Sequence, residues 1–332
     1  MNFRMEQMHR WLKSIFQKDD YELEPLVGDA SFRQYYRIRQ GDKTWMLMDA
    51  DPVKEKPDVF FDVASIMNNH QLNVPECLAF EKDFGFMLMT DFGDQQLFQV
   101  QDKNLKSVLY EVAISNIFDF VKVDANTVPP YEHSKFCSEV DLLVEWFYPF
   151  IGYAPTEDEK NFFLEVRNLL ANICTVQPQV FLHRDYHSKN LMVLNDQDLG
   201  LIDFQDAVKG PITYDLVSLL RDCYVSFDEA YIQKQCRFVY QGLAPYLKNI
   251  SEQEFKRWFD WTGLQRHLKC LGIFTRLELR DGREDYLKHL PRVVGYIEDV
   301  LAAYEAFAEF DQVWRQKIKP CFDKKSNKIK ML

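Results

Sequence analysis

The chain of 332 residues carries a formal net charge of −11, and an acidic surface disfavours nucleic acid as a partner because the phosphates of its backbone are also negative. Hydrophobic residues make up 47% of the chain, which supports a packed globular core rather than a disordered chain. The seven cysteines include no C-x-x-C pair, which argues against a zinc ribbon or a disulfide framework and fits a reducing compartment.

The N-terminal segment is charged throughout and lacks the apolar core of a signal peptide. No uninterrupted apolar run approaches the length of a bilayer span. We therefore expect a cytoplasmic monomer with no stable membrane association. The tail from Lys317 to Lys330 holds six lysines and is predicted to be a solvated, frayed terminus.

The first 92 residues predict a small, antiparallel, β-rich lobe. Apolar residues at helical spacing indicate a helix over residues 2–18. Short aromatic and apolar runs indicate three antiparallel strands between Tyr21 and Ala50, with turns at Gly28-Asp29 and Gly41-Asp42. The remaining elements of this lobe are a helix and two strands, over Val59–His70, Glu76–Glu81 and Phe86–Met89. The segment from Met89 to Gly93 then crosses to the rest of the chain.

Residues 93–332 predict a large helical lobe. Apolar residues at a spacing of three to four mark its helices. The expected helices are 104–121, 138–147, 157–176, 214–224, 251–279 and 285–310. The only clear β element of this part is a hairpin between residues 181 and 203.

That hairpin carries the most specific motif of the chain. From Phe181 it reads F-L-H-R-D-Y-H-S-K-N-L-M-V-L, and after a turn it ends in G-L-I-D-F. Asp185 lies on a loop, Asn190 opens one strand and Asp203 ends the next, so three oxygen-bearing side chains are expected at one end of the hairpin. In protein kinases the same order supplies an Asp that accepts a hydroxyl proton, and an Asn and an Asp that hold Mg²⁺.

The motif therefore predicts an α+β, protein-kinase-like fold of two lobes that uses ATP and Mg²⁺. Asp185 is the predicted base, and Asn190 and Asp203 are the predicted metal ligands. Residues 1–92 are the predicted nucleotide-covering lobe, and residues 93–332 carry the catalytic hairpin and the acceptor site. The alternative is an ordinary surface hairpin with polar tips.

The predicted ATP-binding residues lie in the first lobe. They are a loop and a crossover, Gly28, Asp29, Ala30, Ser31, Phe32, Arg33, Met89, Thr90 and Asp91. The strand Thr44–Ala50 has no phosphate-binding lysine and the helix Val59–His70 has no glutamate to pair with one. Arg33 and Arg37 are candidate replacements, and exposed solubilising arginines are the alternative. A plain β-hairpin tip is the alternative for the loop.

Five stretches make the chain resemble a known family. They are G-D-A-S-F-R-Q-Y-Y-R, W-M-L-M-D-A-D-P, H-R-D-Y-H-S-K-N-L-M, I-D-F-Q-D-A-V-K-G-P-I-T-Y-D and Q-R-H-L-K-C-L-G-I-F-T-R. They resemble the bacterial N-acetylmuramate/N-acetylglucosamine anomeric kinases, a group of the aminoglycoside-phosphotransferase-like kinases. The resemblance extends from about Val27 to Val300, and the family shares the strand without lysine.

The resemblance implies ATP-dependent phosphorylation of the C1 hydroxyl of N-acetylmuramic acid or N-acetylglucosamine. The sugar 1-phosphate would pass to a nucleotidyltransferase that makes the UDP-sugar, in peptidoglycan recycling in a Gram-negative cytoplasm. By motif match it also assigns Asp185 as base and Asn190 and Asp203 as metal ligands. A kinase for an aminoglycoside or another hydroxylated metabolite, and a catalytically silent kinase-like binding protein, are the alternatives.

Candidate substrate-binding residues are less specific. They are Glu145, Trp146, Arg184, Lys189, Gln205, Asp206, Arg221, Arg266 and His267. Glu145 and Trp146, with Glu139, resemble a helix segment of the family, in which the Trp either stacks on the sugar or belongs to the core. Arg221, Arg266 and His267 are polar residues in apolar helices and must face a site or pair internally, because unpaired burial is costly.

Overall fold

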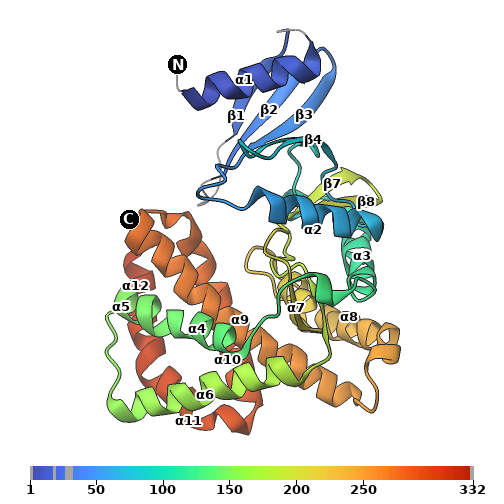
Figure 1. Ribbon diagram of the computed structural model, residues 1–332. Helices are drawn as coiled ribbons and strands as arrows, with labels where there is room; N and C mark the ends of the chain where they lie inside the picture. Colours follow the sequence, from blue (N-terminus) through green and yellow to red (C-terminus); the bar gives the residue numbers. More distant parts are fainter. Residues whose placement is uncertain (1–2, 18–19, 27–32, 330–332) are drawn as a thin grey trace. The chain divides into compact units, whose positions relative to one another are not determined.

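The computed structural model describes residues 3–17, 20–26 and 33–329 (Figure 1). The chain divides into two compact units. The first comprises Met1–Val112 and Lys189–Asp206, and the second comprises Ala113–Ser188 and Ala207–Leu332. The lobe boundary at residue 92 stays a prediction.

The first unit is built on a five-stranded antiparallel sheet. Its order is β1-β2-β3-β5-β4, with bounds Glu22–Leu26, Gln34–Gln40, Lys43–Asp49, Phe86–Thr90 and Cys77–Glu81. Helix α1 (Phe3–Phe16) packs on one face, where Met8 and Leu12, one helical turn apart, join Ile38 and Leu47 in a buried cluster. The predicted helix and strands of this part are confirmed.

A helix and a hairpin complete the first unit. Helix α2 (Pro57–Asn69) starts at a proline, as its first turn allows, and its Phe60 ring lies 4.6 Å from Phe204. Strands β7 (Leu191–Asn195) and β8 (Asp198–Leu201) form the predicted hairpin. Gly200 is required here because a Cβ atom would lie 2.5 Å from the Phe92 ring.

The second unit is mainly helical. Helix α3 (Lys103–Phe120) runs from the first unit into it. The helices that follow are α4 to α12: His133–Leu142, Tyr148–Ile151, Glu157–Val176, Tyr214–Leu220, Glu229–Gly242, Glu252–Asp281, Leu290–Ala303, Ala308–Val313 and Lys319–Ile329. Helix α9 is buried on most of its surface and contacts α4, α6, α7 and α10, so it is the centre of this unit.

Three features of residues 93–332 differ from the sequence prediction. The hairpin is not the only β element of this part, because β6 (Gln179–Leu182) pairs with β9 (Val208–Pro211); two four-residue strands give little periodic signal. Helix α8 was not predicted. The basic tail is not frayed up to residue 329, because α12 buries Phe322 and places the Lys325 ammonium 4.7 Å from the Phe150 ring.

Two more differences concern helix continuity. The predicted helix 138–147 begins at His133 and ends in a π-helical turn, Leu143–Phe147. Pro149 follows this turn and has no N–H group to continue a regular α-helical ladder. The predicted helix 285–310 is split into α10, a short turn and α11. Among the residues given above as described, none lies in a helix long and apolar enough to cross a membrane.

Candidate active site

The loop that carries Asp185 is held within the second unit by buried carboxylates. Asp215, at the start of α7, accepts the backbone N–H of His183 at 2.7 Å and that of Arg184 at 2.9 Å. Burial raises the pKa of Asp215 to about 7, against the lowering effect of these two donors. Further along the loop, Asp222 accepts the backbone N–H of Ser188 at 2.9 Å and also its hydroxyl. The loop is therefore fixed on both sides of Asp185.

The electrostatic surroundings keep Asp185 ionised. Burial raises the pKa of this carboxyl, but Lys269, Arg184, His187 and Arg266 lower it more, to about 2. An ionised carboxylate only accepts hydrogen bonds. The side chain therefore has the chemistry needed to orient a hydroxyl group and take its proton.

A closed ring of polar contacts lies beside this loop. Glu139 accepts a hydrogen bond from the Tyr131 hydroxyl and lies 3.4 Å from the Lys269 ammonium. Lys269 donates to the Tyr214 hydroxyl at 3.3 Å, and the two tyrosine hydroxyls are 3.3 Å apart. Arg184 donates to Glu139 at 2.9 Å. The four ring members are 0 to 7% exposed.

The predicted metal ligands lie together in the first unit. Asn190 directly precedes β7 and Asp203 follows β8, and the Asn190 amide donates to an Asp203 carboxylate oxygen at 3.3 Å. Gln205 donates to the other oxygen of Asp203 at 2.7 Å. A carboxylate and an amide oxygen are hard ligands of the kind Mg²⁺ prefers, so this pair fits that ion. Asp206 follows in the same unit.

Two of the candidate phosphate-binding residues of the first unit, Arg33 and Arg37, form ion pairs with carboxylates. Residues Gly28 to Phe32 lie outside the described part of the chain. Arg33 pairs with Glu55 at 3.0 Å. Arg37 is 5% exposed and pairs with Asp91 at 2.7 Å and Asp94 at 2.8 Å, so the alternative of an exposed solubilising arginine is wrong for it.

Three other candidates of the first unit have defined surroundings. Met89 lies in β5, and Thr90 ends that strand, where its hydroxyl accepts the Glu76 N–H at 2.9 Å. The Lys189 ammonium lies 5.7 Å from the Phe98 ring.

The polar candidates of α7 and α9 pair inside the second unit. Arg221 is buried and pairs with Asp260 at 3.0 Å, and His267 donates to the Arg221 carbonyl at 2.9 Å. Burial lowers the pKa of His267 to about 3, so it is neutral. Arg266 contacts the sulfurs of Cys223 and Cys270. Arg221 and His267 therefore pair internally, whereas Arg266 contacts the two sulfurs and also acts on the carboxylate of Asp185.

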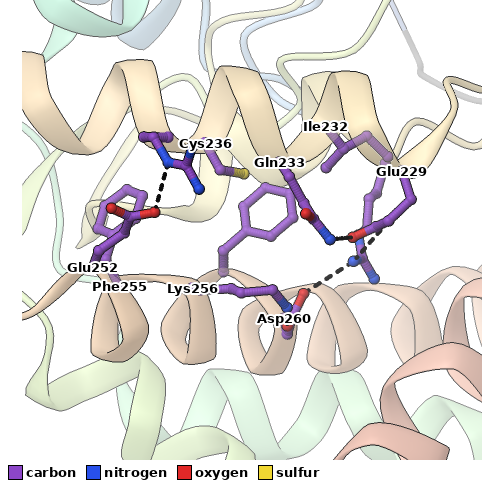
Figure 2. A pocket seen from close by; sticks show the side chains of 11 residues that line it. Glu229, Ile232, Gln233, Cys236, Glu252, Phe255, Lys256 and Asp260 are labelled. Carbon is purple, nitrogen blue, oxygen red and sulfur yellow. Dashed lines mark hydrogen bonds and ion pairs between the residues drawn. The ribbon is translucent and has the colours of Figure 1, made fainter.

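Arg221 also lines a small groove of about 70 Å³ between α8 and α9. Figure 2 shows that charged side chains from both helices face this groove, among them Glu229, Glu252 and Asp260. The charges are paired, as Arg237 with Glu252 at 2.8 Å. Asp185 is not among the lining residues. Glu145 and Trp146 lie in the π-helical turn, the first exposed and the second half-buried.

Comparison with known proteins assigns the family. The sequence profile described as the phosphotransferase enzyme family matches residues 22–246. The chain belongs to this family. It is 33% identical over 329 residues to a protein of Pseudomonas aeruginosa named N-acetylmuramate/N-acetylglucosamine kinase, covering 93% of this chain and 96% of the relative. A protein of Neisseria meningitidis with the same name is 33% identical, covering 92% and 93%. The resemblance predicted from the sequence motifs is confirmed.

Solved structures confirm the fold. The complex of gentamicin with APH(2″)-IIa has a TM-score of 0.61 at 14% identity, covering 91% of this chain and 97% of that one. A spectinomycin phosphotransferase, APH(9)-Ia, in complex with ADP and spectinomycin, has a TM-score of 0.58 at 12% identity, covering 89% and 93%. The protein has the expected protein-kinase-like fold, with an antiparallel β-sheet lobe and a helical lobe, and it is a kinase by family.

The motif did not reveal the residues that hold the loop. Asp215, Asp222 and Lys269 are charged residues within apolar helical segments or at their ends, and they are 0 to 7% exposed. A charged residue in such a segment indicates a buried partner. The sequence therefore shows that these charged residues have buried partners, but it does not identify the residues that they contact.

Proposed function

We propose that the protein transfers the γ-phosphoryl group of ATP, with Mg²⁺, to the anomeric C1 hydroxyl of N-acetylglucosamine and N-acetylmuramic acid. The observation that carries this proposal is the 33% identity, over 93% of this chain, to a protein named for kinase activity on these two sugars. The ionised Asp185 on a fixed loop agrees with it.

The residues divide the chemistry between them. Asp185 orients the C1 hydroxyl and takes its proton as the oxygen bonds to the γ-phosphorus and the bond to the β-phosphate oxygen breaks, which releases ADP. The anomeric hydroxyl is more acidic than an ordinary alcohol, so a carboxylate of low basicity serves it. Asn190 and Asp203 would hold Mg²⁺, which neutralises charge on the phosphates when bound. Gly28–Arg33 and Met89–Asp91 are the proposed nucleotide contacts.

Charge beside the loop favours an acidic or neutral sugar over an aminoglycoside. Lys269, Arg184 and Arg266 all act on Asp185, and Glu139 is the carboxylate that two of them share. These three cations would repel the amino groups of a polycationic antibiotic. The lactyl carboxylate of N-acetylmuramic acid would be attracted, so we expect it to be the better substrate. Glu145, Trp146, Lys189 and Gln205 remain proposed sugar contacts.

The product class sets the biological role that we propose. A sugar 1-phosphate is the acceptor that a nucleotidyltransferase needs to form a UDP-sugar. The proposed role is therefore recycling of cell-wall amino sugars in a Gram-negative cytoplasm, with the protein acting as a monomer.

The test is ADP release from purified protein with ATP, Mg²⁺ and a panel of acceptors. The panel contains both amino sugars, their 1-O-methyl glycosides, aminoglycosides and choline. We expect turnover with the free sugars and none with the glycosides, which have no proton to give at C1. Phosphorus NMR of the product should show coupling to the anomeric proton. A 6-phosphate would refute C1 transfer, an active aminoglycoside would favour the antibiotic kinase, and no ADP release with any acceptor would favour a silent binding protein.

A further inference from the structure

The ring of Tyr131, Glu139, Lys269 and Tyr214 contains buried charges whose desolvation destabilises the fold. Buried ion pairs lose their hydration, and apolar side chains of the same size often give equal or greater stability. Here Lys269 and Arg184 both pair with Glu139, which is 4% exposed, and both also act on the carboxylate of Asp185. Packing alone does not favour two cations and two carboxylates gathered in a largely buried place.

The contact between Glu139 and Arg184 links this ring to the catalytic loop. Arg184 has a φ of 75°, in the left-handed region that residues with side chains rarely adopt. Such a conformation persists where the surroundings impose it. Asp215 holds the Arg184 backbone N–H, Glu139 holds its guanidinium, and the Tyr131 ring lies 5.4 Å from the guanidinium carbon. Asp185 is the next residue, so this turn sets where its carboxylate points.

The titratable groups that interact with Asp185 come from α9, from α7 and from the loop itself. Arg266, Lys269 and Cys270 belong to α9, and Tyr214 and Asp215 belong to α7. Arg184 and His187 belong to the loop itself. Lys269 is the cation of the ring, and it both lowers the pKa of Asp185 and lies beside Glu139. It therefore combines a hold on the loop with an attraction for the carboxylate.

We propose that Glu139 and Lys269 are positioning residues, which fix Arg184 and through its turn hold Asp185 in place for transfer, without contacting the acceptor themselves. This inference rests on the proposed kinase function. It assigns a role to two residues outside the kinase motif, supplied by α4 and α9.

The variants that test it are Lys269→Met, Lys269→Arg and Glu139→Gln. Misplacement of a reacting group by about 1 Å can cost about a hundredfold in rate. We expect Lys269→Met and Glu139→Gln to lower kcat about tenfold to a hundredfold, while KM for ATP and for the sugar changes less than about threefold. Lys269→Arg, which keeps the charge, should restore kcat to within about fivefold of the unmodified protein.

The chain offers a matched control in Glu159 of α6. This carboxylate is 7% exposed, accepts the Tyr153 hydroxyl at 2.8 Å and pairs with Lys317, so it has the same kinds of partners as Glu139. Glu159→Gln should lower the melting temperature as Glu139→Gln does, and leave kcat within about twofold, because a structural loss away from the reacting groups does not change transition-state contacts.

Three results would overturn the proposal. Unchanged kcat in Lys269→Met and Glu139→Gln would make the ring purely structural, and so would an equal loss in Glu159→Gln. A raised KM for the sugar at constant kcat would make Lys269 a direct sugar contact. If Lys269→Met does not fold, Tyr131→Phe decides, since it removes only the hydroxyl that donates to Glu139 and should still lower kcat. If the unmodified protein accepts neither sugar, the proposed substrate fails separately, and the variants are compared with whichever acceptor supports ADP release.

Discussion

Two residues of the hairpin motif have a left-handed backbone conformation. Arg184 and Asp203 have φ angles of 75° and 65°, and each stands directly beside or at a residue that the motif singles out. A left-handed conformation costs about 1–3 kcal/mol for a residue with a side chain. Asp215 and Glu139 hold the first, and the amides of Asn190 and Gln205 hold the second. These polar contacts therefore offset the free-energy cost of the left-handed backbone conformation and orient the two side chains.

Replacement of the predicted base should separate chemistry from binding. In Asp185→Asn the amide keeps the size of the side chain but cannot take a proton. We expect turnover to fall by about two orders of magnitude or more, the usual range for loss of a general base. ADP release under saturating ATP and sugar measures this. Wild-type turnover in the variant would remove Asp185 from the role of base.

The pH dependence of the enzyme should reflect the low pKa of Asp185. Its carboxyl titrates at about 2 because the effect of burial is outweighed by Lys269, Arg184, His187 and Arg266. The base is then ionised at every pH above about 4, where less than about 1% carries a proton. We expect kcat/KM for the sugar to show no loss on acidification from pH 8 to pH 5.5 that belongs to this group. A tenfold fall per pH unit within that range, absent from Asp185→Asn, would contradict it.

Close contact between helices brings the ring residues together. Helix α9 approaches the end of α4 at Gly272, where a Cβ atom would lie 2.5 Å from the backbone carbonyl of Leu142. Lys269 lies one turn earlier on α9 and reaches Glu139 on α4. Glycine at 272 thus allows the approach on which the contact between Lys269 and Glu139 depends.

A pair of glycine substitutions tests this approach. Gly272→Ala must push α4 and α9 apart, and overpacking of this kind costs about 1–3 kcal/mol. Gly295, inside α10, serves as the control, because a Cβ atom added there would meet no atom of the described chain within 4 Å. Gly295→Ala should stabilise the protein by about 0.5–1 kcal/mol through helix propensity. Thermal denaturation of both variants measures the difference, and equal melting temperatures would show that the two helices can shift freely.

At the scale of the whole molecule, local and distant contacts differ in how far sequence reveals them. The motif singles out Asp185, Asn190 and Asp203 because they lie close together in the sequence, and their roles stay predictions. The long amphipathic helix over Glu157–Val176 is confirmed with its predicted bounds. Glu139 reaches Arg184 from 45 positions away, and a charge in an apolar helix does not name its partner. The sequence does not predict the pairing of β6 with β9, because a four-residue strand has little pattern of its own and its partner lies far away along the chain.

Because the predicted metal ligand and the predicted base lie in different units, we expect metal-dependent ATP binding and turnover to be lost separately. Asp203 belongs to the first unit and Asp185 to the second. Asp203→Asn leaves neutral ligands that hold a hard divalent cation poorly, so the Mg²⁺-dependent part of the stabilisation by ATP should disappear together with turnover. A ligand at a hundred times its Kd stabilises by about 2.7 kcal/mol, which a thermal-shift measurement resolves. Asp185→Asn should keep this shift.

Asp198→Asn is the matched control. Asp198 is an exposed carboxylate at the far end of the same hairpin, and among the contacts described it pairs only with Asn195. This variant should keep both the thermal shift and the turnover. Asp203→Asn with a full Mg²⁺-dependent shift would remove Asp203 from the metal site.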